Sequence, residues 1–549
     1  MLYFIPAWYK GKEWCENEQS WLEQRLHSEF DDTVKQIQLF HRNGEYDYQI
    51  LSLGFTPNFR HFLHRQSVYR APYWSCFDAI QEVRRKKVRV LSFHDLKWPE
   101  SVEFLYTQFV VVAMLNGEKY AEINFGEDGN PIWIALYQDG KICRRNIYDD
   151  RGFISATILY EDGQPYYQDY LRENGIWKMR HYLKDGHVEI NTKCPTYLLE
   201  YEGKWKTKQF SRMYYDRIEE VIYEVLDDWL SLTRYSDIFC VAMDGLHAGI
   251  LGKALRHNKK ILSFFQDRYD PALCTDAEHK GALELMQNVD YIVADSRENE
   301  RKVRRMIRVP AGRLMLIPPY DTRADTGISL QSNVQKILLP LDGMDQELAR
   351  KVICVLGKYA SKKENVRVHL LTRDARYNAK QMILSQARSA LASMGMPEAW
   401  VAETEKQMVS ENDLEEEEEI PVLFVPEQCV DEASVSICMR EQWILVDLRD
   451  VPEQYLQINA VSFGIPQIVR KKTDFVQNGG NGIILKKIDQ LPKALTYYLT
   501  GLEHLNEARV SCYKISREYT TERLLKMWGE VMRGVGEDSD FTVGRRRLE

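Results

Sequence analysis

A series of Xaa-Gly pairs at nearly equal spacing constrains the fold most strongly. The gaps between successive glycines are 11, 12, 11, 12 and 11 residues, for Gly129, Gly140, Gly152, Gly163, Gly175 and Gly186. Asp-Gly and Asn-Gly supply the positive φ that tight hairpins need, and each gap holds a β-rich segment such as Ile132 to Tyr137. The pattern predicts an antiparallel meander of about eight strands over residues 105–205.

Strand-like and helix-like periods alternate on both sides of this meander. Before it, the strand periods lie at 2–8, 48–53 and 88–93, and the helical periods at 19–41 and 77–85. After it, helix and strand periods alternate from 214 to 317, starting with a helix over 214–230. Alternation of this kind predicts a parallel sheet covered by helices. The meander is therefore inserted into a first Rossmann-like domain made of residues 1–104 and 206–325.

A second Rossmann-like domain is predicted for residues 334–505, after a polar linker at 325–333. Its strands are expected at 336–341, 366–371, 421–425, 443–446, 467–469 and 483–485. Helices and a basic tail in residues 506–549 are expected to cross back toward the first domain. The predicted fold class is α/β and GT-B-like: two doubly wound Rossmann-like domains facing a cleft, with an inserted antiparallel β-meander domain.

Composition excludes several classes of function. The net charge is -8 and the basic residues are dispersed, which argues against a nucleic-acid partner. The longest apolar run, Phe109 to Leu115, is too short to span a bilayer, and the start of the chain has no signal-peptide pattern. The 10 cysteines and 12 histidines form no short metal-binding motif. We expect a cytoplasmic protein without a metal or cofactor, and a solvated loop at the acidic run 411–419.

Residues 454–485 read as a short helix, a Gly464-x-Pro466 corner, a strand, an Asn/Gly turn and another strand. This segment resembles the donor-binding segment of retaining GT-B glycosyltransferases, which carries two glutamates in a Glu-x7-Glu spacing. In that alignment Val451 and Asn459 occupy the two glutamate positions. The alternative interpretation is structural only: Gly464 ends the helix, Pro466 stops it, and residues 478–482 form a left-handed turn.

The charged groups that hold a sugar nucleotide in such enzymes are also replaced. A pyrophosphate needs cations or amide donors, and the resemblance places an Arg-x4-Lys pair after the first strand of the second domain. Here the pair falls on Leu341 and Gln346, or on Asp342 and Glu347. Four lost charge-assisted bonds would cost on the order of 6 kcal/mol. We therefore predict no catalytic residue, and a vestigial donor cleft at Val451, Glu453, Asn459, Gly464, Thr473 and Asn481.

One phosphate-type feature remains in the first domain. Asp244 to Gly249 follow a predicted strand and open a helix whose amides could receive an anion, and His247 could act as an acid or base. In the alternative interpretation, Gly245 and Gly249 permit close helix packing and His247 is a polar residue of the first turn.

The opening Met1 to Tyr9, the inserted meander and Asn459 to Gly464 within a motif-depleted GT-B frame resemble one family across the whole chain. This family comprises the first of the three accessory secretory proteins of the Gram-positive accessory Sec system. The resemblance implies a non-enzymatic component that assembles with its two sister accessory proteins and the motor ATPase. Together they would deliver a glycosylated serine-rich repeat adhesin to its membrane channel, from a peripheral position at the inner face of the membrane.

Two other functions stay open from the sequence. An active retaining glycosyltransferase could have rebuilt its donor site with Glu453 and with Lys471 or Lys472. Alternatively, the chain could bind carbohydrate, including the sugars of the exported substrate, through aromatic side chains of residues 105–205.

Overall fold

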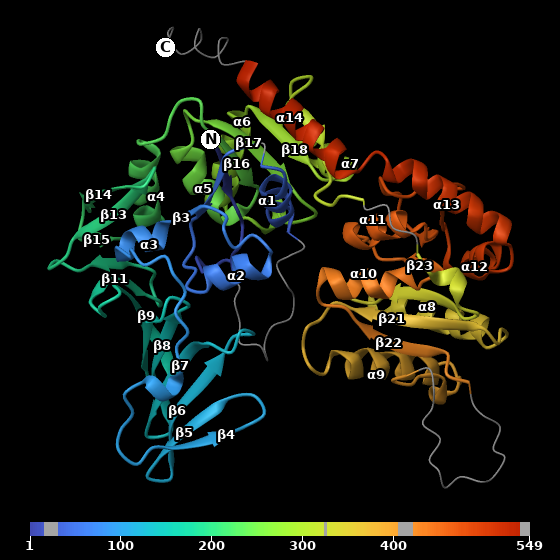
Figure 1. Ribbon diagram of the computed structural model, residues 1–549, viewed down its shortest axis with the longest axis horizontal. Coiled ribbons are helices and arrows are strands. Elements are labelled where there is room, and N and C mark those ends of the chain that lie inside the picture. Colours follow the sequence, from blue (N-terminus) through green and yellow to red (C-terminus); the bar gives the residue numbers. More distant parts are fainter. Residues whose placement is uncertain (16–30, 45, 323–326, 405–420, 538–549) are drawn as a thin grey trace.

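The computed structural model describes residues 1–15, 31–44, 46–322, 327–404 and 421–537. The acidic run 411–419, the first part of the expected helix 19–41, part of the linker 325–333 and the basic tail at 544–549 lie outside the described residues. Figure 1 shows two α/β bodies side by side and a long antiparallel sheet extending from one of them. No helix in the described part of the chain has the length and apolar character needed to cross a membrane.

The first α/β body contains a seven-stranded parallel sheet. Its spatial order is β19-β18-β17-β16-β1-β2-β3. The strands are β1 (Leu2–Ile5), β2 (Tyr48–Ser52), β3 (Tyr73–Ser75), β16 (Ile238–Ala242), β17 (Lys259–Phe264), β18 (Tyr291–Ala294) and β19 (Leu314–Leu316). The helices are α1 (Asp32–Asn43), α2 (Phe59–Arg65), α3 (Cys76–Gln81), α4 (Ile218–Leu230), α5 (Gly245–Ala254), α6 (Asp276–Gln287) and α7 (Arg297–Met306). All residues of β1, β16 and β18 are buried, as expected for a sheet covered on both faces.

Two sequence-based expectations for this body are wrong. The strand expected at 88–93 does not form: Val88 and Val90 are exposed, and the segment leads only into a 3₁₀ turn at Phe93–Asp95. The edge position belongs instead to β3, whose three residues are too few to give a period. The helix expected from residue 214 begins at Ile218, because Tyr214–Tyr215 form strand β15.

The inserted sheet has ten antiparallel strands rather than about eight. Nine of them follow one another along the chain: β4 (Glu103–Tyr106), β5 (Val111–Leu115), β6 (Glu118–Phe125), β7 (Pro131–Gln138), β8 (Lys141–Asp149), β9 (Phe153–Glu161), β10 (Gln164–Leu171), β11 (Trp177–Tyr182) and β12 (Val188–Ile190). Strand β15 adds the tenth beside β12. The six glycines of the turn series have φ between 73° and 83°. The extra strands escaped prediction because β4 precedes the glycine series and β15 has only two residues.

A buried ion network joins the inserted sheet to the first body. Arg60 on α2 contacts Asp150 at 2.6 Å, and Arg151 contacts Asp149 at 2.7 Å and Asp78 on α3 at 2.7 Å. Both arginines and both sheet aspartates are almost fully buried. The network therefore holds the inserted sheet in a fixed position, because it pairs charges of the sheet with charges on α2 and α3. A hairpin of β13 (Thr196–Tyr201) and β14 (Lys204–Gln209) returns the chain to α4.

The second α/β body has a six-stranded parallel sheet in the order β22-β21-β20-β23-β24-β25. Its strands are β20 (Gln335–Pro340), β21 (Val366–Thr372), β22 (Phe424–Gln428), β23 (Ile444–Asp447), β24 (Gln467–Val469) and β25 (Gly482–Ile484). Its helices are α8 (Gln346–Ala360), α9 (Ala379–Ala392), α10 (Glu432–Arg440), α11 (Gln454–Phe463), α12 (Leu491–Leu499) and α13 (Leu502–Ser516). Every strand lies within a few residues of its predicted position.

The last helix, α14 (Thr521–Glu537), returns to the first body, as Figure 1 shows in red. Leu524, Trp528, Val531 and Val535 are buried in the same core cluster as Phe40 of α1. On these sheets we propose a division into residues 1–104 with 206–325, 105–205, 334–505 and 506–549, although β4 and β15 lie just outside the limits of the insert. The predicted fold class, α/β and GT-B-like with an inserted antiparallel sheet, is confirmed.

Candidate functional site

The candidate site is the cleft between the two α/β bodies. In each sheet the strand order reverses once, between β16 and β1 and between β20 and β23, and ligands of open α/β sheets bind outside the strand carboxyl ends at such points. Three polar contacts cross the cleft. Gln454 donates to Asp295 at 2.6 Å, Arg297 pairs with Asp474 at 3.0 Å, and Lys35 on α1 pairs with Glu432 on α10.

Two buried arginines lie on the second-domain side of the cleft, after β21 and β23. Arg449 binds the carboxylate of Asp447 through Nε at 2.8 Å and Nη2 at 2.7 Å, and Nη1 donates to the carbonyl of Asp342 at 3.1 Å. Arg373 pairs with Glu453, and its backbone N–H donates to the carboxylate of Asp342. Although burial disfavours the charged form, Asp447 raises the pKa of Arg449 above its usual value.

This cluster is neutralised from within. Two arginines face three carboxylates, so the formal charge of the cluster is 2 − 3 = −1, for Arg373, Arg449, Asp342, Asp447 and Glu453. Sequence reasoning looked for cations after β20 and missed these two, which follow other strands. The Arg-Asp pairs at the ends of β21 and β23, at the carboxyl edge of a predicted sheet, were the signal that could have revealed them.

A second ion cluster lies on the first-domain side. Arg268 contacts Asp31 at 3.1 Å and also pairs with Asp32, and Trp8 donates its indole N–H to Asp31 at 3.0 Å. Burial and the neighbouring Asp32 raise the pKa of Asp31 to about 6. The aromatic loop after β1 thus serves to hold a carboxylate.

His247 is part of a closed hydrogen-bond chain. Its Nε2 lies 2.7 Å from the carbonyl of Ala242, which can only accept, so Nδ1 accepts from the Tyr9 hydroxyl at 3.0 Å. Burial lowers the pKa of His247, which favours the neutral ring. The neighbouring glycines permit close helix packing, because a Cβ on Gly281 of α6 would lie 2.3 Å from the Cα of Gly249. These contacts favour the structural interpretation of residues 244–249.

A cavity of about 130 Å³ opens between the bodies, beside the N-terminus of α7. Its wall includes Gln457, which is fully buried, together with Gln454 and Thr473. Both amide atoms of Gln457, the Gln454 amide oxygen and the Thr473 hydroxyl are buried without a hydrogen-bond partner among the described residues. Since buried polar groups are nearly always paired, these groups indicate that the cavity receives water or a polar ligand. Its volume corresponds to about four water molecules.

The structure brings some of the predicted donor-cleft positions together. Val451 and Thr473 line the cavity, and Glu453 lies beside it at the N-cap of α11. Asn459 instead donates to the carbonyl of Tyr455 within its own helix at 2.8 Å.

The two remaining positions support the backbone. Gly464 ends α11 with a φ of 72°, and Arg509 packs against it. Asn481 is buried and closes the turn, because its side chain accepts from Gln477 N at 2.7 Å and donates to Phe475 O at 2.8 Å. These two positions shape the cleft without lining the cavity.

The fold defines a class first. The pneumococcal O-GlcNAc transferase GtfA, solved in complex with UDP and GlcNAc, superposes with a TM-score of 0.66 over 97% of this chain and 98% of its own, at 12% identity. The likeness shows that the chain has the fold of GT-B glycosyltransferases.

The family is defined by sequence. Residues 1–534 match the family of the first accessory secretory protein of the accessory Sec system. A curated protein of the same description from Streptococcus gordonii is 30% identical over 96% of this chain and 98% of its own length. A chain from the crystal structure of accessory secretory protein 1, 2 and 3 in Streptococcus pneumoniae is 26% identical, with a TM-score of 0.76 over 98% of this chain and 100% of that chain. The chain belongs to this accessory Sec family, and the resemblance inferred from its residues is confirmed.

Proposed function

We propose that this chain is a non-catalytic scaffold of the accessory Sec export machinery. It assembles with two sister accessory proteins and the motor ATPase, and it delivers a glycosylated serine-rich repeat adhesin to the membrane channel. Family membership and the solved assembly of three accessory proteins from Streptococcus pneumoniae support this proposal. We place the protein in the cytoplasm, at the inner face of the membrane through its partners.

The internally neutralised arginine cluster carries the non-catalytic part of the proposal. A sugar nucleotide brings a doubly charged pyrophosphate, and an active site must offer available cations to it and to the leaving phosphate. Here Arg373 and Arg449 already pair with Glu453 and Asp447, and the cluster has a formal charge of 2 − 3 = −1. A pyrophosphate at this position would meet repulsion and would have to break buried ion pairs, which is costly.

The alternative of an active retaining glycosyltransferase depended on Glu453 as a substitute for a lost glutamate. Because Glu453 pairs with Arg373 and lies 3.8 Å from Arg449, its carboxylate is engaged in holding the cluster. Lys472 lines the cavity, whereas Lys471 is directed at the exposed Asp450. This arrangement favours the scaffold.

Two measurements test the scaffold proposal. Calorimetry with common sugar nucleotides should show no binding tighter than millimolar, and a micromolar dissociation constant would overturn the non-catalytic assignment. Purification from a native host at moderate salt should retain the two sister proteins and the motor ATPase. Isolation of the chain alone under those conditions would contradict the assembly.

Binding of the adhesin's sugars is a further part of the proposal, and we assign it to the cavity beside Gln457. The unpaired amide and hydroxyl groups there match the neutral donors and acceptors of a sugar ring. A Gln457→Leu variant should lose glycan binding, whereas Gln442→Leu, a buried glutamine elsewhere in the second domain, should retain it. If removal of residues 105–205 abolishes binding while Gln457→Leu does not, the sugars bind to the inserted sheet.

A further inference from the structure

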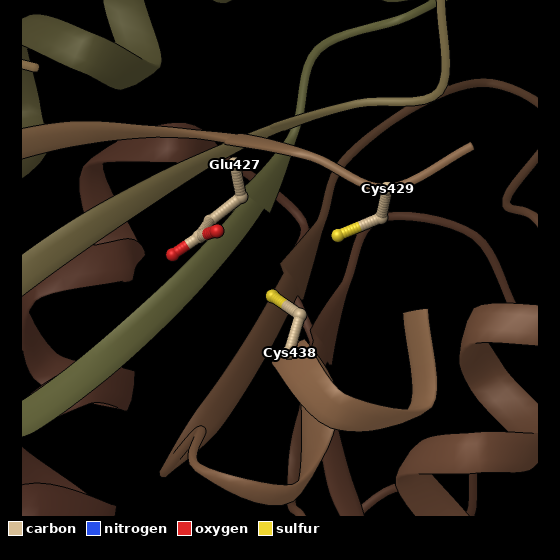
Figure 2. Close-up of side chains that lie close together, drawn as sticks. All are labelled: Glu427, Cys429 and Cys438. Carbon is tan, nitrogen blue, oxygen red and sulfur yellow. The ribbon is translucent and has the colours of Figure 1, made fainter. Parts of the chain in front are cut away.

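Glu427, Cys429 and Cys438 form a cluster in the second domain that the function proposed above does not use. Glu427 is in β22, Cys429 follows that strand, and Cys438 is on α10. The two sulfur atoms and a carboxylate oxygen all lie within 4.8 Å of one another. Figure 2 shows the sulfur atoms turned toward each other with the carboxylate of Glu427 beside them. The three groups come from separate elements, so no sequence spacing announces them.

The dimensions suit one tetrahedral metal ion. Zinc lies about 2.3 Å from a thiolate sulfur and about 2.0–2.2 Å from a carboxylate oxygen, so two ligands of one ion are about 3.5–3.8 Å apart. Small side-chain rotations would bring the three atoms from their present separations to these values. Thiolates select soft or borderline cations such as Zn²⁺ over Mg²⁺ and Ca²⁺.

The surroundings orient two of the three ligands. Glu427 accepts a hydrogen bond from Nδ1 of the buried His369 at 2.8 Å, which fixes one carboxylate oxygen. The Gln442 amide N–H₂ lies 3.7 Å from the Cys438 sulfur and can donate to a thiolate there. Metal-binding carboxylates are held in this way by neighbouring groups in known sites. The amide oxygen of Gln442 is buried without a partner among the described residues.

Access and charge also fit a metal ion. Cys429 is 3% exposed, whereas Glu427 and Cys438 are partly exposed, so an ion can enter from solvent. In the metal-free protein, the hydrogen bond with Cys429, followed by burial, raises the pKa of the Cys438 thiol. Binding therefore displaces two protons: two thiols and M²⁺ give a dithiolate complex and two H⁺.

We propose that Glu427, Cys429 and Cys438 form a binding site for one thiophilic divalent cation of the Zn²⁺ class, with water at the fourth position. The ion joins the end of β22 to α10. Because α10 also carries Glu432, the partner of Lys35 across the cleft, bound metal stabilises one wall of the cleft.

Cadmium titration of the reduced full-length protein tests the site, because each thiolate–Cd²⁺ bond adds charge-transfer absorption in the ultraviolet. The wild type should show this absorption saturating at one equivalent, and Zn²⁺ should compete for it. Cys438→Ser should abolish the one-equivalent phase, and His369→Gln should weaken binding about 10- to 100-fold. Cys143→Ser is the matched control, since Cys143 is also partly buried but lies in the inserted sheet.

Three outcomes would overturn the proposal: no saturable absorption in the wild type, an unchanged titration in Cys438→Ser, or loss in the Cys143→Ser control. Thiol alkylation of the wild type gives a second measurement that needs no variant. Zn²⁺ should slow alkylation of Cys438 at least about tenfold without slowing that of Cys143. Equal rates with and without Zn²⁺ would contradict metal binding at these sulfurs.

Discussion

Replacing Glu453 with glutamine tests whether internal pairing keeps anions out of the cleft. The substitution preserves the shape of the side chain and changes the formal charge of the arginine cluster from −1 to 0, since the cluster then holds two arginines and two aspartates. It also removes the carboxylate that Nη1 of Arg373 contacts. The variant therefore offers a pyrophosphate a less repulsive site.

The size of the effect follows from Coulomb's law. One unit charge about 5 Å from another contributes about 3 kcal/mol at an effective dielectric constant of about 20. Glu453 is 18% exposed, so we reduce this value for solvent screening to about 1.5 kcal/mol, or roughly tenfold in affinity. Pyrophosphate and UDP should bind Glu453→Gln about tenfold more tightly than the wild type in calorimetry at low salt.

Asp450→Asn provides the control, because Asp450 is close in sequence but 67% exposed and pairs with Arg470 outside the cluster. The gain should be confined to Glu453→Gln and should shrink as salt screens the charges. Equal affinities in the wild type and Glu453→Gln, with both folded by circular dichroism, would refute the reasoning. The same gain in Asp450→Asn would show a general charge effect instead.

Three further predictions concern stability. Trp528→Ala should destabilise the first domain by about 3–5 kcal/mol in urea unfolding, because the ring is 1% exposed and packs edge-on against Phe40 at 5.6 Å; a loss below about 1 kcal/mol would show that α14 is not part of this core. Arg151→Ala should cost about 3–5 kcal/mol and expose the joint of the inserted sheet to proteolysis, since it leaves buried carboxylates unpaired; a protease pattern identical to that of the wild type would count against this role. For Asp31, whose raised pKa is about 6, the folded state holds the proton more tightly than the unfolded state, so its contribution to stability falls by up to about 3 kcal/mol between pH 4 and pH 6. Asp31→Asn should flatten this fall in thermal melts, and an unchanged pH profile would contradict it.

Much of the fold could be predicted because its signals are local. The glycine turns fix hairpins within a few residues, and buried strands such as β20 and β24 are continuous apolar runs with clear limits. Elements that form only through tertiary contacts could not be found in this way. Strand β15 has two residues and exists because β12 offers an edge, and residues 88–93 look like a strand although no neighbouring strand among the described residues pairs with them.

The candidate site was predictable in position but not in chemistry. The topology places residues 451–482 at the cleft, and the replacement of both glutamates is visible in the sequence. The pairing of Arg373 with Glu453 is not visible, because the two residues are far apart in sequence and meet only when β21 and α11 are in place. The same is true of the unpaired amide of Gln457, since hydrogen-bond satisfaction depends on every neighbour in the folded state.

The return of α14 to the first domain has a consequence for biosynthesis. The core that begins with Leu2 of β1 is completed by Trp528 and Val535 of α14, more than 500 residues later in the sequence. A ribosome releases the N-terminal strands long before it releases this helix, so the first domain cannot bury its full core during most of translation. The second domain lies wholly between the two and has its own core cluster. We therefore expect the second domain to complete its core before the first domain does, and a truncated product lacking α14 to expose an apolar groove that chaperones and proteases recognise.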